Sequence, residues 1–224
     1  MIKLEKEFQL KEGDDYSFIN PFSLGVVAQE LSDEECERIN FYADGIAVVI
    51  YARLFKNKKI TRTSFDDTSI APIVYNYAVQ QHRTVTLVGG TEENVEKAKQ
   101  LLEIKYPGIN ITLARSGYFQ DATEYNLFLQ KALSSDILIV GMGAGKQERT
   151  LLDMRELGWK GTGFTCGGYL DQFVEAKGQD YYPDFVNRFH LRWLYRMCKE
   201  PRRLLKRYLK DYPYYLIKFG NKIR

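Results

Sequence analysis

Apolar positions along the chain follow two patterns: short continuous runs, and longer stretches in which apolar residues recur every three or four positions. The short runs are rich in β-branched and aromatic residues and end at glycine, proline or polar residues, which is typical of buried strands. Three of the longer stretches begin at a Ser or Thr that can cap a helix: Thr68, Thr91, and Ser32, which would start a second segment inside 22–42. The predicted strands are 16–20, 46–51, 84–88, 109–113, 136–140 and 163–166, and the predicted helices are 22–42, 68–81, 91–106, 122–134 and 146–157.

The alternation of strands and helices predicts an α/β domain with a Rossmann-like, largely parallel sheet flanked by helices. We place this domain at residues 1–178, because no convincing strand follows Gly178. Residues 179–224 are predicted to form a basic helical appendage laid over the domain or projecting from it. Its expected helical segments are 186–198, 201–210 and 212–219.

Glycine turns follow three of the predicted strands, at Gly89-Gly90, Gly141–Gly145 and Gly167-Gly168. The carboxyl ends of parallel strands meet at one edge of a sheet, and ligands of such sheets bind there. Backbone N–H groups and a helix N-terminus at such a turn favour a phosphate. A tight connection with no ligand is the alternative at each turn.

The turn at 141–148 matches neither GxxxxGK[ST] nor a good GxGxxG, so no familiar phosphate loop is present. Gln147, Glu148 and Asp171 are candidates for hydrogen bonds to a base or ribose. For each of them alone, a helix cap or a solvated side chain is an equal alternative.

Composition argues against several kinds of site and against a secreted or membrane-spanning protein. The chain has 224 residues, and its three cysteines are far apart without CxxC spacing, which argues against a disulfide scaffold or a zinc site. Only two histidines are present, and the acidic residues form no DxD pattern, so no metal ion is implied. The N-terminus lacks the features of a secretion signal, and no run of about 18 apolar residues could span a membrane. We therefore expect a cytoplasmic protein.

Charge is distributed unevenly. Residues 188–224 carry twelve Lys or Arg against Glu200 and Asp211, whereas the rest of the chain has 20 basic and 27 acidic residues. Aromatic residues lie between these cations. Such a segment can lie on an anionic membrane, bind nucleic acid or a pyrophosphate, or simply cover the sheet as a solvated basic helix.

Asp44 and Arg62 carry weak signals by themselves. Asp44 precedes the predicted strand 46–51 in an Asp-Gly pair, which usually means a turn, and Arg62 lies in a polar loop like an ordinary surface arginine. No Ser/His/Asp or Cys/His set is convincing.

These residues nevertheless occur in an order that resembles the WecG/TagA/CpsF glycosyltransferases, also called glycosyltransferase family 26. The similarity runs from about Asn20 to about Pro213. It rests on Asp44-Gly45, Val88-Gly89-Gly90, Tyr106-Pro107-Gly108, Gly117-Tyr118-Phe119, Gly141-x-Gly143-x-x-Lys146-Gln147-Glu148 and Trp193-Leu194-Tyr195-Arg196-x-x-x-Glu200-Pro201-x-Arg203.

The resemblance implies an inverting glycosyltransferase that moves a sugar from a UDP-sugar to a polyprenyl-diphosphate-linked glycan in bacterial surface polysaccharide synthesis. It implies no cofactor and no metal. It also implies a peripheral location on the inner face of the cytoplasmic membrane, contact with an anionic membrane surface, and no nucleic-acid partner. A homo-oligomer is left open.

Residue by residue, Asp44 matches the proposed general base of that family and Arg62 an active-site arginine. Gln147 and Asp171 match nucleotide contacts, and Arg196 and Arg203 match appendage arginines that stabilise the departing diphosphate. Together with the glycine turns, these matches predict substrate contacts at Asn20, Tyr118, Gly141, Gly143, Gln147, Glu148, Gly168, Asp171, Arg196, Arg203 and Arg207.

The chain departs from the family pattern at four places. Phe18 replaces a threonine, Gly145 replaces a proline, Phe65 replaces a glycine, and the segment 179–183 replaces an Arg-Ala-Pro. We expect Gly145 to loosen its turn. The alternative functions are a non-catalytic nucleic-acid-binding module with a basic C-terminal arm, and another α/β enzyme that acts on a phosphorylated metabolite.

Overall fold

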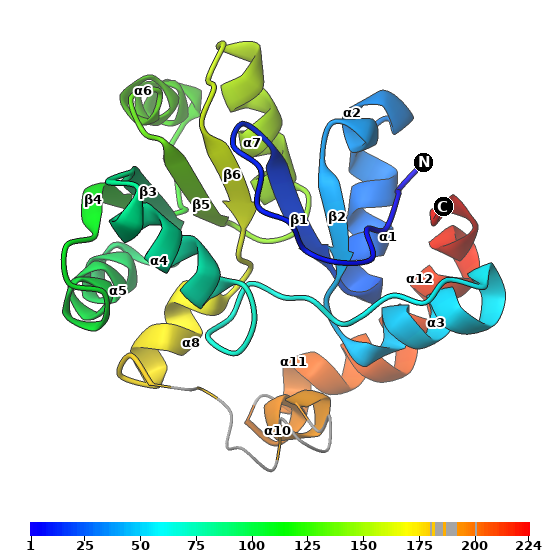
Figure 1. The fold of residues 1–224 in the computed structure, drawn as a ribbon. Coiled ribbons are helices and arrows are strands. Elements are labelled where there is room, and N and C mark those ends of the chain that lie inside the picture. The colour runs from blue at the N-terminus through cyan, green and yellow to red at the C-terminus, as the bar shows by residue number, and fades with distance from the viewer. Residues whose placement is uncertain (180, 182–185, 187–191, 200) are drawn as a thin grey trace.

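The computed structural model describes residues 1–179, 181, 186, 192–199 and 201–224. Its centre is a six-stranded sheet in the order β2-β1-β6-β5-β3-β4, in which every pair is parallel (Figure 1). This confirms the predicted Rossmann-like sheet flanked by helices. The strands are β1 (Asp15–Ile19), β2 (Asn40–Ala43), β3 (Thr84–Gly89), β4 (Asn110–Arg115), β5 (Ile137–Gly141) and β6 (Thr162–Thr165).

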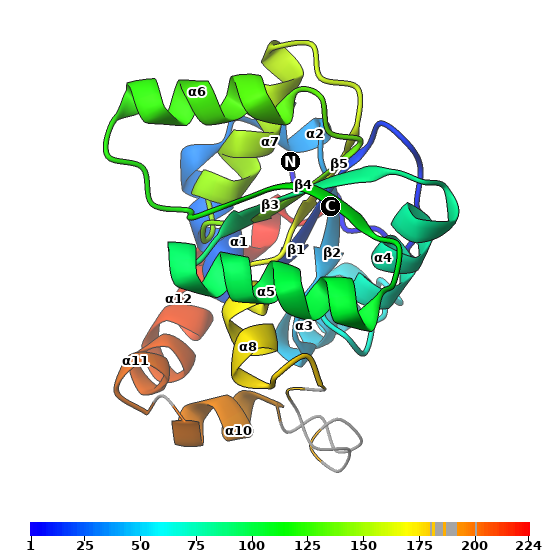
Figure 2. The ribbon, with the colours of Figure 1, turned by 90° about the vertical axis from the view of Figure 1, so that its left-hand side faces the viewer.

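Helices cover both faces of the sheet (Figures 1 and 2). In the part of the chain before the appendage they are α1 (Pro21–Glu30), α2 (Asp33–Glu37), α3 (Ile46–Lys56), α4 (Ala71–Gln80), α5 (Glu92–Lys105), α6 (Ala122–Ala132), α7 (Lys146–Glu156) and α8 (Tyr169–Glu175). The described part of the appendage contains α10 (Arg192–Lys199), α11 (Pro201–Lys206), a π-helical turn (Arg207–Asp211) and α12 (Tyr212–Phe219).

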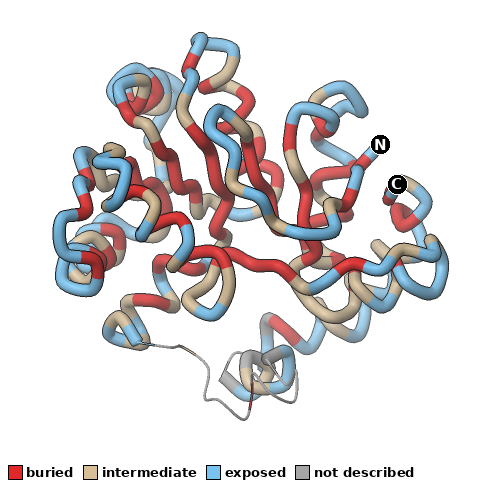
Figure 3. The backbone as a smooth tube through the Cα atoms, in the orientation of Figure 1, coloured by how far each residue is buried: buried red, intermediate tan, exposed pale blue. Residues whose placement is uncertain are grey.

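The sheet separates one hydrophobic cluster on one face from two on the other, and its strands are buried along most of their length (Figure 3). On one face, α4, α5 and α8 pack over β3, β5 and β6 in a single aromatic-rich cluster. On the other face, α1, α3 and α12 pack near β1 and β2, while α6 and α7 pack over β3 and β5. Burial on both faces explains why β5, with the sequence ILIVG, is a continuous apolar run.

Residues 40–56 differ from the prediction. The helix expected at 22–42 ends earlier, because β2 occupies Asn40–Ala43, and the strand expected at 46–51 is instead the helix α3. β2 pairs with the free side of β1, where Ser17 lies opposite Phe41. This long-range pairing outweighs local propensity. Asp44 therefore follows a strand, and the prediction that it precedes one is wrong.

Two of the three predicted helix caps are confirmed, and one is wrong. Ser32 caps α2 through its side chain, which accepts from the Glu35 N–H at 3.1 Å, and Thr91 caps α5 in the same way through Asn94. Thr68 caps no helix, because its N–H donates to Asp66 at 2.9 Å and α4 begins only at Ala71.

The end of the appendage joins the domain. Tyr215 of α12 packs against Gly25 of α1, and Phe219 and Ile223 belong to the same core cluster as Val27. The two termini lie together in Figure 1, because the Ile2 N–H donates to the Lys222 carbonyl at 2.9 Å. Residues 212–224 thus share a core with the domain, while the boundary at 178 stays a prediction.

Candidate active site

The carboxyl ends of all six strands open on one edge of the sheet, on the lower side in Figure 1. Beyond these ends lie Asp44 after β2, Asn20 after β1, and the glycine turns after β6, β5 and β3. Tyr118, whose side chain is exposed, follows β4. The strand order therefore brings most of the predicted site residues to a single edge.

The glycine turns touch one another through their backbones. A Cβ on Gly89 would lie 2.7 Å from the Gly141 carbonyl oxygen, and a Cβ on Gly141 would lie 2.7 Å from the Gly167 carbonyl oxygen. Gly117 is also close to Gly89, because a Cβ on Gly117 would lie 3.1 Å from the Gly89 Cα. Neither Gly89 nor Gly117 was among the predicted contacts. Without side chains, these turns leave backbone groups at the edge of the sheet.

The turns after β5 and β6 also mark a change of direction. The chain leaves β5 for α7 on one face of the sheet and leaves β6 for α8 on the other. A crevice forms where neighbouring parallel strands diverge in this way, and such crevices bind ligands in α/β sheets. Gly143 and Gly168, one in each turn, are exposed there.

Glu148 is completely buried behind these turns. Its carboxylate accepts hydrogen bonds from the Ser17 hydroxyl at 2.7 Å, the Gly145 N–H at 2.8 Å and the Gln147 side-chain amide at 3.0 Å. Burial raises the pKa of Glu148 above its usual value, although these donors oppose the shift. The Gln147 side-chain oxygen in turn accepts from the Gly167 N–H at 3.2 Å. Both side chains hold the turns together from inside the protein.

Two buried hydroxyls extend this network. Thr165 of β6 donates to the Ser17 hydroxyl at 3.1 Å and accepts from the Phe18 N–H at 3.3 Å. The network therefore ties β1, β6 and α7 together directly behind the crevice. Ser17 and Thr165 were not predicted as site residues, because an isolated hydroxyl inside an apolar strand carries no distinctive signal.

Gly145 is the N-cap of α7, with φ at +82°. Proline cannot adopt this φ and has no N–H to donate to Glu148. The expectation that glycine loosens the turn is therefore wrong, since glycine permits the hydrogen bond that closes it.

Asp171 lies in the first turn of α8 and reaches back to the turn after β3. Its Oδ1 accepts from the Asn94 side-chain amide at 2.7 Å, and a Cβ on Gly90 would also lie 2.7 Å from this oxygen. The side chain is exposed at the carboxyl edge. Its position agrees with a contact to the nucleotide, which stays a prediction.

Asn20 follows β1 and caps α1. Its side-chain oxygen accepts from the N–H groups of Phe22 at 3.0 Å and Ser23 at 3.1 Å. Because this oxygen caps the helix, the predicted substrate contact of Asn20 would have to be made by its other atoms.

Asp44 and Arg62 meet at the end of β2. The Asp44 N–H donates to the Ile19 carbonyl at 2.8 Å, and the Thr63 N–H donates to the Ala43 carbonyl at 2.9 Å, so the loop after α3 runs beside the strand end. As a result Arg62 Nη2 lies 3.6 Å from Asp44 Oδ1, and both side chains are partly exposed. The structure thus pairs the predicted base with the predicted arginine.

Asp66 holds this arginine in place and was missed. Its Oδ2 accepts from Arg62 Nη2 at 2.9 Å and also from the Ser64 hydroxyl. Its Oδ1 accepts from the Thr68 N–H, which makes an Asx turn. The Asp-Asp-Thr sequence signals such a turn, and this signal could have identified Asp66 as a positioning residue.

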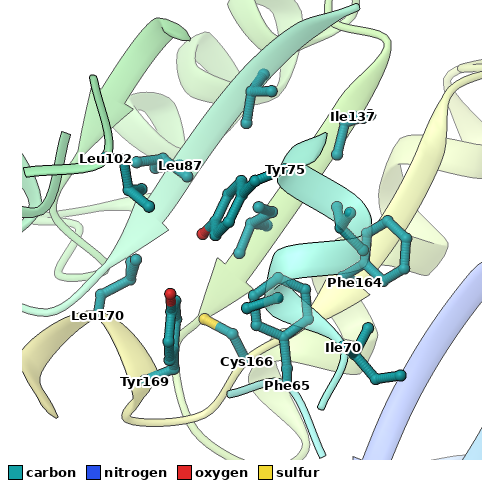
Figure 4. Packing of buried hydrophobic residues seen from close by; sticks show 14 of the residues in the cluster. Phe65, Ile70, Tyr75, Leu87, Leu102, Ile137, Phe164, Cys166, Tyr169 and Leu170 are labelled. Carbon is teal, nitrogen blue, oxygen red and sulfur yellow. The ribbon is translucent and has the colours of Figure 1, made fainter. Parts of the chain in front are cut away.

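Phe65 anchors the same loop in the core. Its side chain is buried among Phe164, Tyr169 and Tyr75, with ring centroids 5.7, 5.4 and 6.1 Å away (Figure 4). The residue that replaces the family's glycine is therefore a hydrophobic anchor between Arg62 and Asp66.

Of the three predicted appendage arginines, the structure describes the side chain of Arg207. Arg196 lies in α10 and Arg203 in α11, but their side chains are outside the described part of the structure. The Arg207 guanidinium stacks over the Phe22 ring at 4.0 Å. Because Phe22 lies in the first turn of α1, Arg207 is next to the end of β1.

A separate recess of about 440 Å³ opens at the amino ends of the strands, among residues that include Glu12, Arg83 and Asp136. Its arginine is already paired, at 2.7 Å from Glu12 and 3.8 Å from Asp136. We therefore place the candidate site at the carboxyl edge.

Known proteins resemble this chain along nearly its whole length. The model of the family described as Glycosyl transferase WecG/TagA/CpsF family matches residues 16–224. A relative from Shigella boydii, the UDP-Gal:alpha-D-GlcNAc-diphosphoundecaprenol beta-1,4-galactosyltransferase, is 32% identical over 204 residues, which are 91% of this chain and 84% of the relative. The matched range includes every turn of the carboxyl edge.

Proposed function

Since the chain belongs to the WecG/TagA/CpsF family and is a glycosyltransferase, we propose that it transfers a sugar from a UDP-sugar to a polyprenyl-diphosphate-linked glycan. We further propose that the transfer inverts the anomeric centre and needs no metal ion. The observation that supports the proposed sugar transfer most directly is the pair of Asp44 and Arg62, which lies at the edge where the glycine turns open.

Asp44 is the proposed base. Its carboxylate accepts the proton of the attacking acceptor hydroxyl, whose oxygen then forms a bond with the anomeric carbon. The bond between that carbon and the diphosphate breaks on the opposite side, and UDP leaves with its negative charge. Arg62 orients the carboxylate through the contact described above.

The departing diphosphate needs cations, and the proposal assigns them to the appendage. Arg207 lies beside the end of β1, and Arg196 and Arg203 are the proposed companions. A guanidinium matches two phosphate oxygens with parallel hydrogen bonds, so arginines can stabilise the charge that develops on UDP.

The donor is proposed to lie along the edge of the sheet, with its nucleotide over the turns after β5 and β3. The strand order separates β5 from β2 by three steps, or about 14 Å at the usual strand spacing. An extended UDP-sugar can bridge this span, which would bring its sugar toward Asp44.

The name of the Shigella boydii relative supports the proposed chemistry. It specifies UDP-Gal as donor, a GlcNAc on diphosphoundecaprenol as acceptor, and a β-1,4 linkage. UDP-galactose carries an α linkage, so a β product corresponds to inversion. For this chain we propose the same class of acceptor, and with it a peripheral location at the membrane that holds the lipid.

The test is a transfer assay with the full chain, a synthetic GlcNAc-diphosphate lipid and separate UDP-hexoses and UDP-N-acetylhexosamines. We expect one donor to give a product that is one sugar heavier by mass spectrometry. The coupling constant of its new anomeric proton should report a β linkage, and EDTA should leave the rate unchanged.

Each part of the proposal can fail separately. No product with any UDP-sugar would contradict the donor class, and an α linkage would contradict inversion. A loss of rate in EDTA that added Mg²⁺ restores would contradict metal independence.

A further inference from the structure

The outer face of α3 is apolar although it is exposed. Ile50 is 48% exposed and Leu54 is 69% exposed, one helical turn apart, and Phe55 near the end of the helix is also 69% exposed. The opposite face of the helix is in the core, because Val48 and Ala52 are fully buried. Contiguous exposed apolar residues on one helix face mark a contact surface, because solvated helix faces are normally polar.

This apolar face lies in a cationic stretch of the chain. Between residues 46 and 60 there are four cations and no Asp or Glu. The cations are Arg53, Lys56, Lys58 and Lys59. Apolar side chains near Lys and Arg fit the interface of an anionic bilayer. The apolar side chains enter the boundary of the hydrocarbon layer, and the cations contact the headgroups.

Further exposed apolar residues lie in the neighbouring appendage. Leu205, Leu209 and Ile217 are 49%, 71% and 84% exposed, in a segment that also contains Lys206, Lys210 and Lys218. The end of this segment touches α3, because Lys56 Nζ donates to the Asn221 carbonyl at 3.3 Å. Figures 1 and 2 place α3 and α11 on the side of the sheet where the strands end.

We propose that α3 is a membrane-contacting helix of the α/β domain itself, which inserts Ile50 and Leu54 into an anionic bilayer beside the active site. The charge pattern selects this occupant over a second copy of the chain, since two such cationic faces would repel each other. The N-cap of α3 is Gly45, directly after Asp44. Helix insertion would therefore hold Asp44 at the depth of lipid diphosphates, a consequence that rests on the proposed function, whereas the membrane contact does not.

The test compares the full chain with the double variant Ile50→Ser/Leu54→Ser in sedimentation with vesicles of phosphatidylglycerol and phosphatidylcholine. The matched control is Leu127→Ser/Leu157→Ser, which removes two side chains that are 57% and 43% exposed, from α6 and the end of α7. Each apolar side chain that leaves water contributes about tenfold to partition. We therefore expect about a hundredfold weaker vesicle binding for the α3 variant and wild-type binding for the control.

Two further measurements separate the outcomes. Transfer to a water-soluble acceptor with a short alkyl chain should be the same for the α3 variant and wild type. If wild type transfers no sugar at all, the proposed function fails, while the vesicle comparison still decides the role of α3.

Equal vesicle binding by the α3 variant and wild type would overturn the inference, and so would a wild-type protein that does not bind vesicles. Light scattering without vesicles tests the alternative that a second copy of the chain binds to the apolar face of α3. A wild-type dimer that the α3 substitutions convert to a monomer, with vesicle binding unchanged, would make this face a contact between copies instead.

Discussion

The guanidinium of Arg62 lies 3.6 Å from the carboxylate of Asp44, measured from Nη2 to Oδ1. The two residues come from different segments, because Asp44 follows β2 and Arg62 belongs to the loop that returns after α3. Asp66 Oδ2 lies 2.9 Å from the same Arg62 nitrogen. Because two carboxylates contact this nitrogen, the guanidinium has little freedom to turn away, and the pair is a preformed part of the edge where the substrate is proposed to bind.

Replacing Asp44 with asparagine should lower the rate of sugar transfer by about a hundredfold to ten thousandfold, the usual effect of losing a general base. The shape of the side chain is kept, so UDP affinity in calorimetry should stay within about twofold. Glu103→Gln, an exposed substitution on α5, is the control and should leave the rate unchanged. Near-normal turnover by Asp44→Asn would remove Asp44 from the mechanism.

Replacing Phe65 with alanine should lower the free energy of unfolding by about 3–5 kcal/mol, as expected when a buried aromatic ring is truncated. Urea unfolding measures this change. Phe55→Ala is the matched control, because that ring is 69% exposed, and it should change stability by less than about 0.5 kcal/mol. Equal effects of the two substitutions would show that Phe65 is not a core anchor.

Replacing Gly141 with alanine should distort the contact between the turns after β5 and β6. The new Cβ would lie 2.7 Å from the Gly167 carbonyl oxygen, so the backbone must shift, at about 1–3 kcal/mol of stability. We also expect weaker UDP binding in calorimetry. Glu103→Ala, an exposed substitution on α5, is the control and should keep wild-type stability and UDP binding. If Gly141→Ala binds UDP like wild type, the close approach of the turns has no part in nucleotide binding.

Glu148 makes stability depend on pH in a defined direction. Burial raises its pKa in the folded protein above the ordinary value of 4.5, so the folded state holds this proton more tightly than the unfolded state. The stability from Glu148 is therefore fully present below about pH 4.5 and is lost as the pH rises through the raised pKa. Glu148→Gln lacks this titration. The unfolding free energy of wild type minus that of Glu148→Gln should shrink with rising pH in urea titrations, and a difference that grows instead would contradict the assignment.

Most of the architecture could be predicted because its signals are local. The strand at 137–141 is a continuous apolar run, the strand at 84–89 is rich in β-branched residues, and both end in glycine. Thr91 marks a helix start by itself. The family resemblance, which the comparisons confirm, was carried by short motifs in a particular order. It identifies an enzyme, so the alternative of a non-catalytic nucleic-acid-binding module is set aside.

Residues 40–56 could not be assigned from local pattern. Asn40–Ala43 is a strand because the side of β1 was open to it, and Ile46–Lys56 is a helix because Val48 and Ala52 pack into the core. Both outcomes depend on partners that are distant in the chain. For the same reason the sequence placed Asp44 before a strand, whereas the fold places it at the end of one.

Residue types and local order were thus enough to indicate the class of fold and the glycine turns, because hydrophobic period and turn chemistry act over a few neighbours. Asp44 became the candidate base only through the family resemblance, because its Asp-Gly pair alone indicates a turn. Tertiary structure alone decided which of these residues meet. The strand order placed Asp44 on the same edge as Gly141 and Gly167, and the return of the loop placed Arg62 beside Asp44. Burial turned Glu148 inward as a support for the turns. Strand pairing and packing are long-range interactions, and a linear pattern does not state which distant partners satisfy them.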